Sequence, residues 1–362
     1  MPDIDRQYVE ERLAEWIDPL TGEDLVSGKS IKGVGVSGGR ISVEVQLGYP
    51  AKGLAESYAE SIGSHLEADP QIDAAVVNVG WRIHAHKVQG DLTPIKGVKN
   101  VIAVASGKGG VGKSTTAVNL ALALQADGAA VGILDADIYG PSQPRMMGLS
   151  GRPEIRGESI VPKVNYGVQT MSIGYLIDED QPMIWRGPMV TQALQQLINE
   201  TEWSDLDYLI VDMPPGTGDI QLTLAQRVPV SGAIIITTPQ DISLLDARKG
   251  LKMFEKVDVP VLGIVENMST HICSKCGHEE HIFGTGGGAQ MAQEYGVELL
   301  GSLPLDIRIR EQTDSGKPTV IADAESKIAE DYLAIARKSA ARLSTQARNK
   351  KLQFPNIVIQ NT

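Results

Sequence analysis

A glycine-rich stretch at residues 107–114 has the residue types and the spacing needed to hold the phosphates of a nucleotide. It fits the pattern G-x-x-x-x-G-K-S/T at every fixed position. Glycines let backbone N–H groups curl around phosphate oxygens, Lys113 supplies a positive charge, and the hydroxyl of Ser114 can bind Mg²⁺. The residues expected to contact the nucleotide here are Gly107, Lys108, Gly109, Gly110, Val111, Gly112, Lys113, Ser114 and Thr115.

The same glycines also fit the fingerprint G-x-G-x-x-G of dinucleotide-binding folds, with Gly107, Gly109 and Gly112 at its fixed positions. Asp135 lies near the distance expected for an acid that binds a ribose. A dinucleotide loop, however, needs neither a lysine and a serine after its third glycine nor a second acidic strand end. We therefore interpret the stretch as the P-loop of an ATPase.

Two apolar segments end in aspartates that can serve the same nucleotide. Asp212 follows residues 208–211, so its carboxylate is expected at the carboxyl edge of the sheet, where it can hold Mg²⁺ through water. Residues 213–219 contain two prolines, which stiffen the backbone, and then two glycines, which make it flexible. Such a segment suits a loop that senses the γ-phosphate. Of the pair Asp135 and Asp137, we expect Asp137 to orient the attacking water, because it lies further out, while the other acid caps or braces the loop.

Lys108 distinguishes this stretch from an ordinary P-loop. A lysine so early in the loop cannot easily fold back onto its own phosphate, because Lys113 occupies that place. It is either a solvated side chain or free to reach a nucleotide on a facing subunit. The residues expected to act in hydrolysis are Lys108, Lys113, Asp137 and Asp212.

The chain has 2 cysteines, Cys273 and Cys276, and their C-x-x-C spacing lets two thiolates bind one metal centre. An iron–sulfur cluster usually needs four thiolates, which a symmetric dimer supplies as two from each subunit, in an exposed and labile site. A mononuclear zinc site completed by histidines is an alternative. A redox dithiol, or a loop without metal, is a third reading. The histidines near this pair are His271, His278 and His281.

The elements that position these residues follow an alternating pattern after Asn100. Strands are expected at residues 101–105, 130–134, 208–211, 232–237, 261–265 and 299–303, with helical spacing at 117–124, 244–257 and 328–343. Short apolar strands that alternate with helices predict an α/β fold, with a mainly parallel sheet covered by helices on both faces.

The pattern divides the chain into parts. Its 362 residues suit two domains. Residues 1–88 predict a small α+β domain, and residues 89–100, with Gly90, Pro94, Gly97 and several polar residues, predict a linker. Residues 101–349 are expected to form the P-loop domain, and residues 350–362 a short tail without an assigned role.

The composition limits the possible partners. With 33 basic and 45 acidic residues the net charge is -12, so neither nucleic acid nor a membrane is expected as a partner. The acidic amino-terminal sequence lacks the apolar core of a signal peptide. We therefore expect a cytoplasmic protein, in which the two cysteines form no structural disulfide.

Taken together, these residues resemble a known family. Residues 108–114 are similar to the deviant Walker motif of the MinD/ParA/nitrogenase-iron-protein class. The Mrp/ApbC iron–sulfur cluster carriers have motifs similar to residues 135–142, 185–189, 212–219 and 266–268, and their cluster cysteines follow the last of these. The resemblance covers about residues 95–345, and residues 1–88 resemble more weakly a domain often fused ahead of bacterial members.

The resemblance implies a homodimer that binds and hydrolyses ATP at the subunit interface and carries a 4Fe-4S cluster to apoproteins. It implies that Lys108 reaches the partner's nucleotide, that Asn267 lies near the adenine, and that Cys273 and Cys276 bind the labile cluster. This chain departs from the family at Ser274, where many members have proline.

Three other functions use the same P-loop. A positioning ATPase of the MinD/ParA kind binds membrane or DNA and needs a basic amphipathic helix, but residues 337–342 are only slightly basic. An electron-transfer ATPase like the nitrogenase iron protein needs a cluster that is stable to redox cycling. A zinc-stabilised P-loop ATPase would use the cysteines and histidines without iron.

Overall fold

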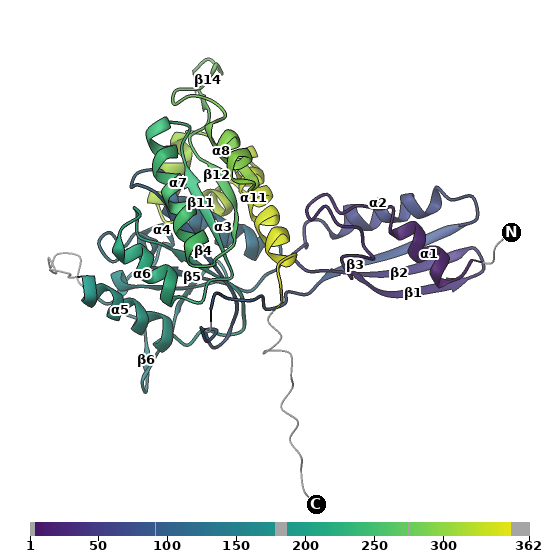
Figure 1. Cartoon of the computed structure of the whole chain (residues 1–362), viewed down its shortest axis with the longest axis horizontal. Coiled ribbons are helices and arrows are strands. Elements are labelled where there is room, and N and C mark those ends of the chain that lie inside the picture. The colour runs from purple at the N-terminus through teal and green to yellow at the C-terminus, as the bar shows by residue number, and fades with distance from the viewer. Residues whose placement is uncertain (1–3, 91, 178–186, 274, 349–362) are drawn as a thin grey trace, which may run out of the picture.

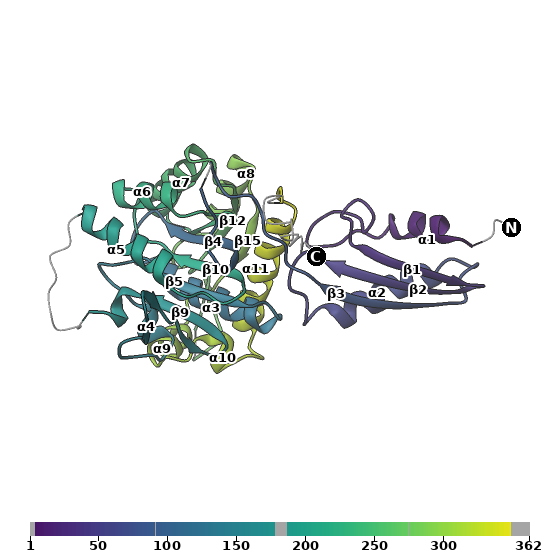
Figure 2. The same cartoon turned by 90° about the horizontal axis from the view of Figure 1, so that it is seen from below.

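The structure is a computed structural model and describes residues 4–90, 92–177, 187–273 and 275–348. It consists of a small α+β unit, which contains the amino terminus, and a larger α/β unit beside it (Figures 1 and 2). The expected tail at residues 350–362 lies outside the described residues, as do the first two residues of the motif at 185–189. No helix among the described residues is long and apolar enough to cross a membrane.

The small unit packs two helices on one face of a three-stranded sheet (Figure 1). Its elements are α1 (Arg6–Leu13), β1 (Ile31–Ser37), β2 (Arg40–Leu47), α2 (Ala55–Glu67) and β3 (Ala74–Trp81). Strand β2 lies in the middle, antiparallel to β1 and parallel to β3. Along β2 every second side chain is buried, because successive side chains of a strand point to opposite faces.

The large unit is built on an eight-stranded sheet with the order β15-β12-β11-β4-β10-β5-β9-β8. These strands are β4 (Val98–Ser106), β5 (Val131–Asp135), β8 (Lys163–Asn165), β9 (Val168–Ser172), β10 (Leu206–Asp212), β11 (Gly232–Thr237), β12 (Val261–Glu266) and β15 (Leu299–Ser302). Neighbours are parallel except β8 and β9. The expected mainly parallel sheet is confirmed.

Helices cover both faces of this sheet (Figure 2). One core contains α3 (Lys113–Ala126) and α11 (Lys327–Ser344) together with the apolar residues of the small unit. The other core contains α5 (Gly187–Glu200), α6 (Asp219–Arg227), α7 (Asp241–Lys256) and α8 (Gly287–Tyr295). The shorter elements are α4 (Gln143–Met146), β6 (Ile155–Arg156), β7 (Ser159–Ile160), a 3-10 turn (Ile173–Tyr175), β13 (His271–Ile272), β14 (Glu279–Glu280), α9 (Ile307–Asp314) and α10 (Thr319–Ala322).

Two parts of the sheet differ from the sequence expectation. Strand β4 begins at Val98, inside the stretch expected to be a linker. Strands β8 and β9 were not expected, because polar residues interrupt them. Two of these, Thr170 and Ser172, are buried in β9, where their hydroxyl groups find partners in Tyr175 and Asp135. Polar side chains with such partners can be buried in a strand without an apolar pattern in the sequence.

The two units are joined by an ion pair at the far end of α3. Asp127 ends this helix, and Arg337 of α11 donates to its carboxylate from Nε at 2.6 Å and from Nη2 at 2.9 Å. From the small unit, the N–H of Gly53 donates to the same carboxylate at 3.2 Å, and the N–H of Lys52 donates to the carbonyl of Asp127 at 3.0 Å. The helix that begins at the P-loop therefore ends against the small unit.

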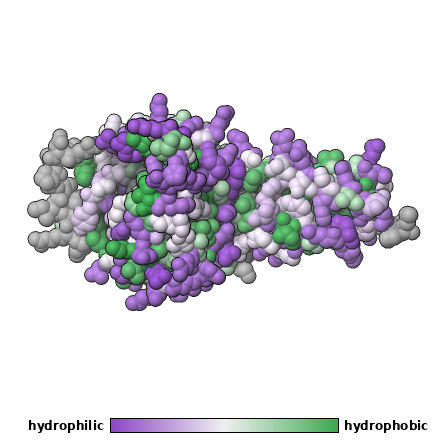
Figure 3. Space-filling view, turned by 90° about the horizontal axis from the view of Figure 1, so that it is seen from above, coloured by the Kyte–Doolittle hydropathy of each residue, from purple (hydrophilic) through white to green (hydrophobic). Residues whose placement is uncertain are grey.

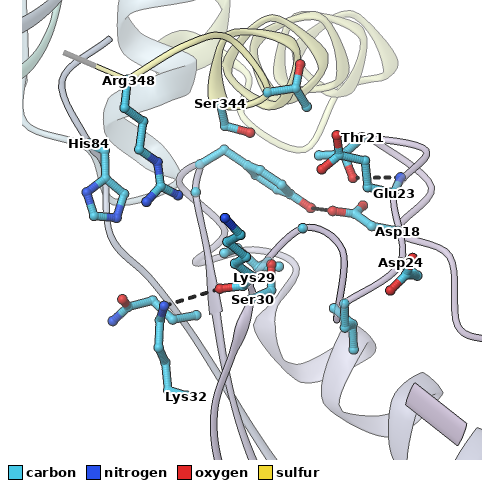
Figure 4. Close-up of a pocket in the computed structure, with 17 residues that line it drawn as sticks. Asp18, Thr21, Glu23, Asp24, Lys29, Ser30, Lys32, His84, Ser344 and Arg348 are labelled. Carbon is cyan, nitrogen blue, oxygen red and sulfur yellow. Dashed lines mark hydrogen bonds between the residues drawn. The ribbon is translucent and has the colours of Figure 1, made fainter. Parts of the chain in front are cut away.

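A polar cavity lies at the same junction, between the small unit and the end of α11 (Figure 4). The carboxylate of Asp18 accepts hydrogen bonds there from Tyr49 Oη at 2.7 Å and from Tyr58 Oη at 3.3 Å. His84 and Arg348 line another part of this cavity, on the side of the chain that leads into the large unit.

Candidate functional site

The P-loop joins the end of β4 to the start of α3, so it lies at the carboxyl edge of the parallel sheet. Gly110 and Gly112 adopt φ values of 80° and 81°, which favour glycine because other residues are strained there. Gly107 is required for another reason, since a Cβ at this position would collide with the backbone of Asp246 on α7. Sequence and geometry therefore agree on why the loop is rich in glycine.

An open pocket of about 270 Å³ lies over this loop. It is lined by Ser106, Lys108, Gly109, Gly110, Gly112, Lys113, Ser114, Thr115, Asp137, Gly140, Ser142, Met146 and Pro215. Most of the expected nucleotide contacts thus face one cavity, together with the expected water-orienting Asp137. Gly107, Val111, Asp212 and Asn267 are not on its wall.

Lys113 forms a buried ion pair with Asp212 beneath this pocket. The ammonium group donates to Asp212 Oδ1 and, at 3.1 Å, to Ser114 Oγ. The side chain of Lys113 is 6% exposed and that of Asp212 is fully buried. One cation therefore bridges the two oxygens that were expected to serve Mg²⁺, and an oxygen pair of this kind fits the preference of that ion.

Asp135 lies on β5 next to Asp212 on β10 and braces the loop that follows it. Its carboxylate accepts hydrogen bonds of 3.0 to 3.1 Å from the backbone N–H groups of Asp137, Ser142 and Gln143. Burial, and after it the neighbouring charge of Asp212, raise the pKa of Asp135 to about 7. With its oxygens used in this way, Asp135 has the bracing role that was foreseen for one acid of the pair.

Asp137 is half-buried and lines the pocket together with residues of the P-loop. Burial raises the pKa of its carboxyl group, while the charge of Lys113 acts in the opposite direction. Its backbone N–H is held by Asp135, so the main chain presents this carboxylate to the pocket.

Asn267 follows β12 and contacts the backbone of the P-loop. Its side-chain nitrogen donates to the carbonyl of Val111 at 2.8 Å, and a Cβ on Gly112 would collide with it. Its own N–H donates to the carbonyl of Thr237 at 2.8 Å. The structure therefore places this residue, expected near the adenine, against the backbone of the phosphate-binding loop.

The two cysteines lie in the hairpin between β13 and β14, at the tip of the large unit (Figure 1). Both are free thiols; Cys273 is half-buried and Cys276 is exposed. The N–H of Cys273 donates to the carbonyl of His278 at 2.9 Å, which closes the hairpin. Backbone N–H groups of Lys275 and Cys276 lower the pKa of Cys273 and so favour the thiolate, the form that binds metals.

The nearby histidines support the hairpin. Nδ1 of His271 lies 3.0 Å from the carbonyl oxygen of Leu305, and Nδ1 of His281 lies 3.0 Å from that of Ser269. Because a carbonyl only accepts, each ring carries its proton on Nδ1. In the described part of the chain no three His, Cys, Asp or Glu side chains group as a metal site. The described residues of one chain therefore do not assemble the zinc alternative.

Sequence reasoning missed Gln143, the first residue of α4. Its side chain is fully buried, and its nitrogen donates to Asp212 Oδ2 at 2.8 Å and to the carbonyl of Ser114 at 3.1 Å. No motif marks a glutamine at this place. Its only signal is its position at the end of the loop that begins with Asp135.

Comparisons with known proteins agree with this arrangement. The family described as NUBPL iron-transfer P-loop NTPase matches residues 97–340, and the family described as iron-sulfur cluster assembly protein matches residues 6–79. The resemblance read from the motifs is thereby confirmed.

Individual proteins match over long stretches. The chain is 60% identical over 275 residues to the iron-sulfur cluster carrier protein of Pseudomonas fragi, covering 75% of this chain and 96% of that protein. It is 50% identical over 343 residues to the iron-sulfur cluster carrier protein of Haemophilus influenzae, covering 94% of this chain and 93% of that protein.

A solved structure is similar to this chain in fold. A nucleotide-binding protein from Archaeoglobus fulgidus, in complex with ADP, matches with a TM-score of 0.57 and 35% identity over 65% of this chain and 93% of that chain. The protein described here belongs to the NUBPL iron-transfer P-loop NTPase family.

Proposed function

We propose that this protein hydrolyses ATP and carries a labile 4Fe-4S cluster between two subunits, for delivery to apoproteins. The observation that carries the proposal is the combination, in one chain, of a complete P-loop and a hairpin with two free thiols. The relatives from Pseudomonas fragi and Haemophilus influenzae, both named iron-sulfur cluster carriers, support it.

Nucleotide binding uses the start of α3. The N–H groups of the P-loop and the positive end of the helix dipole face the phosphates. Lys113 can serve these phosphates only after its ammonium leaves Asp212. Ser114 Oγ and Asp212 would then hold Mg²⁺, which when bound neutralises charge on the β- and γ-phosphates. The structure therefore shows the phosphate-binding lysine paired with a carboxylate of its own chain.

Hydrolysis breaks the bond between the γ-phosphorus and its bridging oxygen while a water attacks in line. Asp137, which lines the same pocket as the P-loop, orients this water. Lys108, in the P-loop, is half-buried, lines the same pocket and is assigned to the nucleotide of the partner subunit. Two chains would then be needed to complete one site.

The surface around the hairpin suits such a dimer. Exposed apolar side chains gather at this end of the large unit, on α7 and beside the hairpin: Ile242, Leu245, Ile272 and Ile282 are 53% to 69% exposed. Figure 3 looks onto this end and shows apolar side chains among hydrophilic ones. A two-fold axis through this surface would bring four thiolates to one cluster, two from each subunit.

Anaerobic reconstitution with iron and sulfide tests the proposal. We expect the parent protein to bind about four irons per two chains, with the visible absorption of a cluster. A variant with Cys273→Ala and Cys276→Ala should stay colourless, whereas His278→Ala, in the same exposed loop, should bind the cluster. If the double cysteine variant retains iron and sulfide like the parent, the cluster lies elsewhere. One tightly bound zinc per chain would support the zinc site instead.

A further inference from the structure

The orientation of the Gln143 side chain is fixed by its neighbours. Its amide nitrogen lies 2.8 Å from Asp212 Oδ2 and 3.1 Å from the carbonyl oxygen of Ser114. Both of these oxygens only accept hydrogen bonds, so the nitrogen of the amide must face them. The amide oxygen, Oε1, is consequently turned away from both.

That oxygen is buried without a partner. Among the residues that the structure describes, neither Gln143 Oε1 nor Ser142 Oγ finds a hydrogen-bond donor, although both atoms are shielded from solvent. Buried acceptors are almost always satisfied, so an unsatisfied pair beside a ligand pocket points to donors that arrive with the ligand.

The two oxygens belong to neighbouring residues at the nucleotide site. Ser142 lines the nucleotide pocket together with Ser114 and Asp137. Gln143 contacts both Ser114 and Asp212, whose oxygens share the ammonium of Lys113. Magnesium in phosphate sites usually keeps several of its waters, and each of these is a hydrogen-bond donor.

We propose that Gln143 is a positioning residue of the magnesium–nucleotide site. Its nitrogen holds Oδ2 of Asp212, so that Oδ1 stays turned toward Ser114 when Lys113 leaves for the phosphates. Its Oε1, together with Ser142 Oγ, accepts hydrogen bonds from waters on the ion. This inference rests on the proposed ATP hydrolysis and adds two residues to its site.

The two oxygens of the Asp212 carboxylate have different partners, and this arrangement supports the role. One oxygen binds the ammonium of Lys113, which has to move, and the other binds the amide of Gln143, which is fixed in a buried helix start. The backbone N–H of Gln143 is itself bound by Asp135, so the glutamine is held at both ends. A carboxylate with one oxygen always occupied does not need to reorient when its cation changes.

Two variants of the full chain test the inference through binding rather than turnover. Gln143→Met keeps the length of the side chain and removes its polar atoms. Ser142→Ala removes one hydroxyl group that has no partner in the described chain. Binding of a fluorescent ADP analogue is measured in EDTA and again during a titration with Mg²⁺ alone. A matched control is Gln169→Met on β9, whose amide pairs with the backbone of Ser204.

We expect Gln143→Met to raise, by about 10-fold or more, the Mg²⁺ concentration that gives half of the full change in analogue binding. Loss of a group that hydrogen-bonds a metal ligand typically weakens metal binding by this amount. The affinity for the analogue in EDTA should stay within about twofold, because the amide of Gln143 binds Asp212 and the carbonyl of Ser114, and Gln143 does not line the nucleotide pocket. Ser142→Ala should give a smaller shift in the same direction, and Gln169→Met none.

Several outcomes would overturn the inference. Equal losses of analogue binding with and without Mg²⁺ would show that Gln143 only supports packing. A parental Mg²⁺ response in Gln143→Met would show that it has no role at the ion. If Gln143→Met fails to fold, as judged by its thermal transition, Ser142→Ala decides, and a parental response there refutes the water contacts. Failure of the parent to bind nucleotide at all would instead refute the proposed function.

Discussion

The side-chain amide of Asn267 donates a 2.8 Å hydrogen bond to the carbonyl oxygen of Val111, in the middle of the P-loop. Two residues later, the carbonyl of Ser269 is bound by His281, which follows the cysteine hairpin. Between them, Met268 adopts a left-handed φ of 57°, which is uncommon for a residue other than glycine. A short, hydrogen-bonded segment therefore connects the phosphate-binding loop with the thiols.

This connection predicts that nucleotide changes the reactivity of the cysteines through Asn267. Because the chain has 2 cysteines, alkylation measured by mass spectrometry reports on the hairpin alone. We expect ATP to change the alkylation rate of the parent, and Asn267→Ala to lose this response while its rate without nucleotide stays similar. Asn199→Ala, on the exposed side of α5, is the control. An unchanged ATP response in Asn267→Ala would contradict the coupling.

Removal of Lys113 should affect both turnover and stability. Lys113→Ala is expected to abolish hydrolysis, because the outer phosphates lose the positive charge that the lysine supplies to them. It also leaves the buried carboxylate of Asp212 without its cation, next to Asp135, at a cost of about 3–5 kcal/mol in the free energy of unfolding. Urea denaturation measures this loss. Adding Asp212→Asn should recover much of the stability without restoring hydrolysis, and a double variant no more stable than Lys113→Ala would refute the explanation.

Lys108→Ala should slow turnover by about tenfold or more while nucleotide binding is largely kept, because a cation supplied from a partner acts mainly on the transition state. Mixing two variant chains tests whether Lys108 acts across the subunit interface. A dimer of one Lys108→Ala chain with one Lys113→Ala chain contains one complete site, made from the intact Lys113 of the first and the intact Lys108 of the second. Activity should therefore return when these two weak variants are combined. Parental turnover in Lys108→Ala alone would show that the cross-subunit role is wrong.

Acid should weaken the fold through the histidines at the junction. Burial and the neighbouring Arg348 lower the pKa of His84 from 6.5 to about 4, and burial also lowers the pKa of His86. Between the ordinary and the lowered pKa of His84, the unfolded chain binds more protons than the folded chain. The free energy of unfolding therefore falls as the pH decreases from about 6.5 to about 4. Thermal unfolding across this range measures the effect. His84→Gln should flatten the dependence, and a variant as acid-sensitive as the parent would exclude His84 as its source.

Loss of Arg337 should loosen the attachment of the small unit. Arg337→Met keeps the aliphatic stem but removes both hydrogen bonds to the buried carboxylate of Asp127. We expect a loss of about 1–3 kcal/mol, the usual cost of a buried group left without its partner. Limited proteolysis of the segment between the units should become faster. Arg342→Met on the same helix, where the arginine is exposed, is the control and should behave like the parent.

The parts of this protein that could be predicted from sequence are those with local rules. The P-loop has fixed residues at fixed spacing, and β10 is a continuous apolar run that ends in Asp212. Both patterns follow from chemistry within a few neighbouring residues, and so does the parallel sheet. Asp137, the outer acid of its pair, lines the nucleotide pocket, and its expected role in orienting the attacking water stays a prediction.

What escaped prediction depends on contacts between distant residues. Gln143 and Asp212 are 69 positions apart, and Asn267 and Val111 are 156 positions apart. No local pattern of charge or hydropathy records such a pair. The histidines near the cysteines suggested zinc by composition, yet His271 is bound to a carbonyl 34 positions away. Long-range partners of this kind appear only once the sheet is assembled.

The ion pair between Asp127 and Arg337 also limits how the chain can vary. A Cβ at Gly53 would lie against both partners, 2.8 Å from Asp127 Oδ1 and in collision with Arg337 Nη2. One added methyl group at a surface turn would thus separate the carboxylate from the guanidinium. Position 53 belongs neither to the P-loop nor to the cysteine hairpin, yet a side chain there would disturb the contacts that hold the small unit.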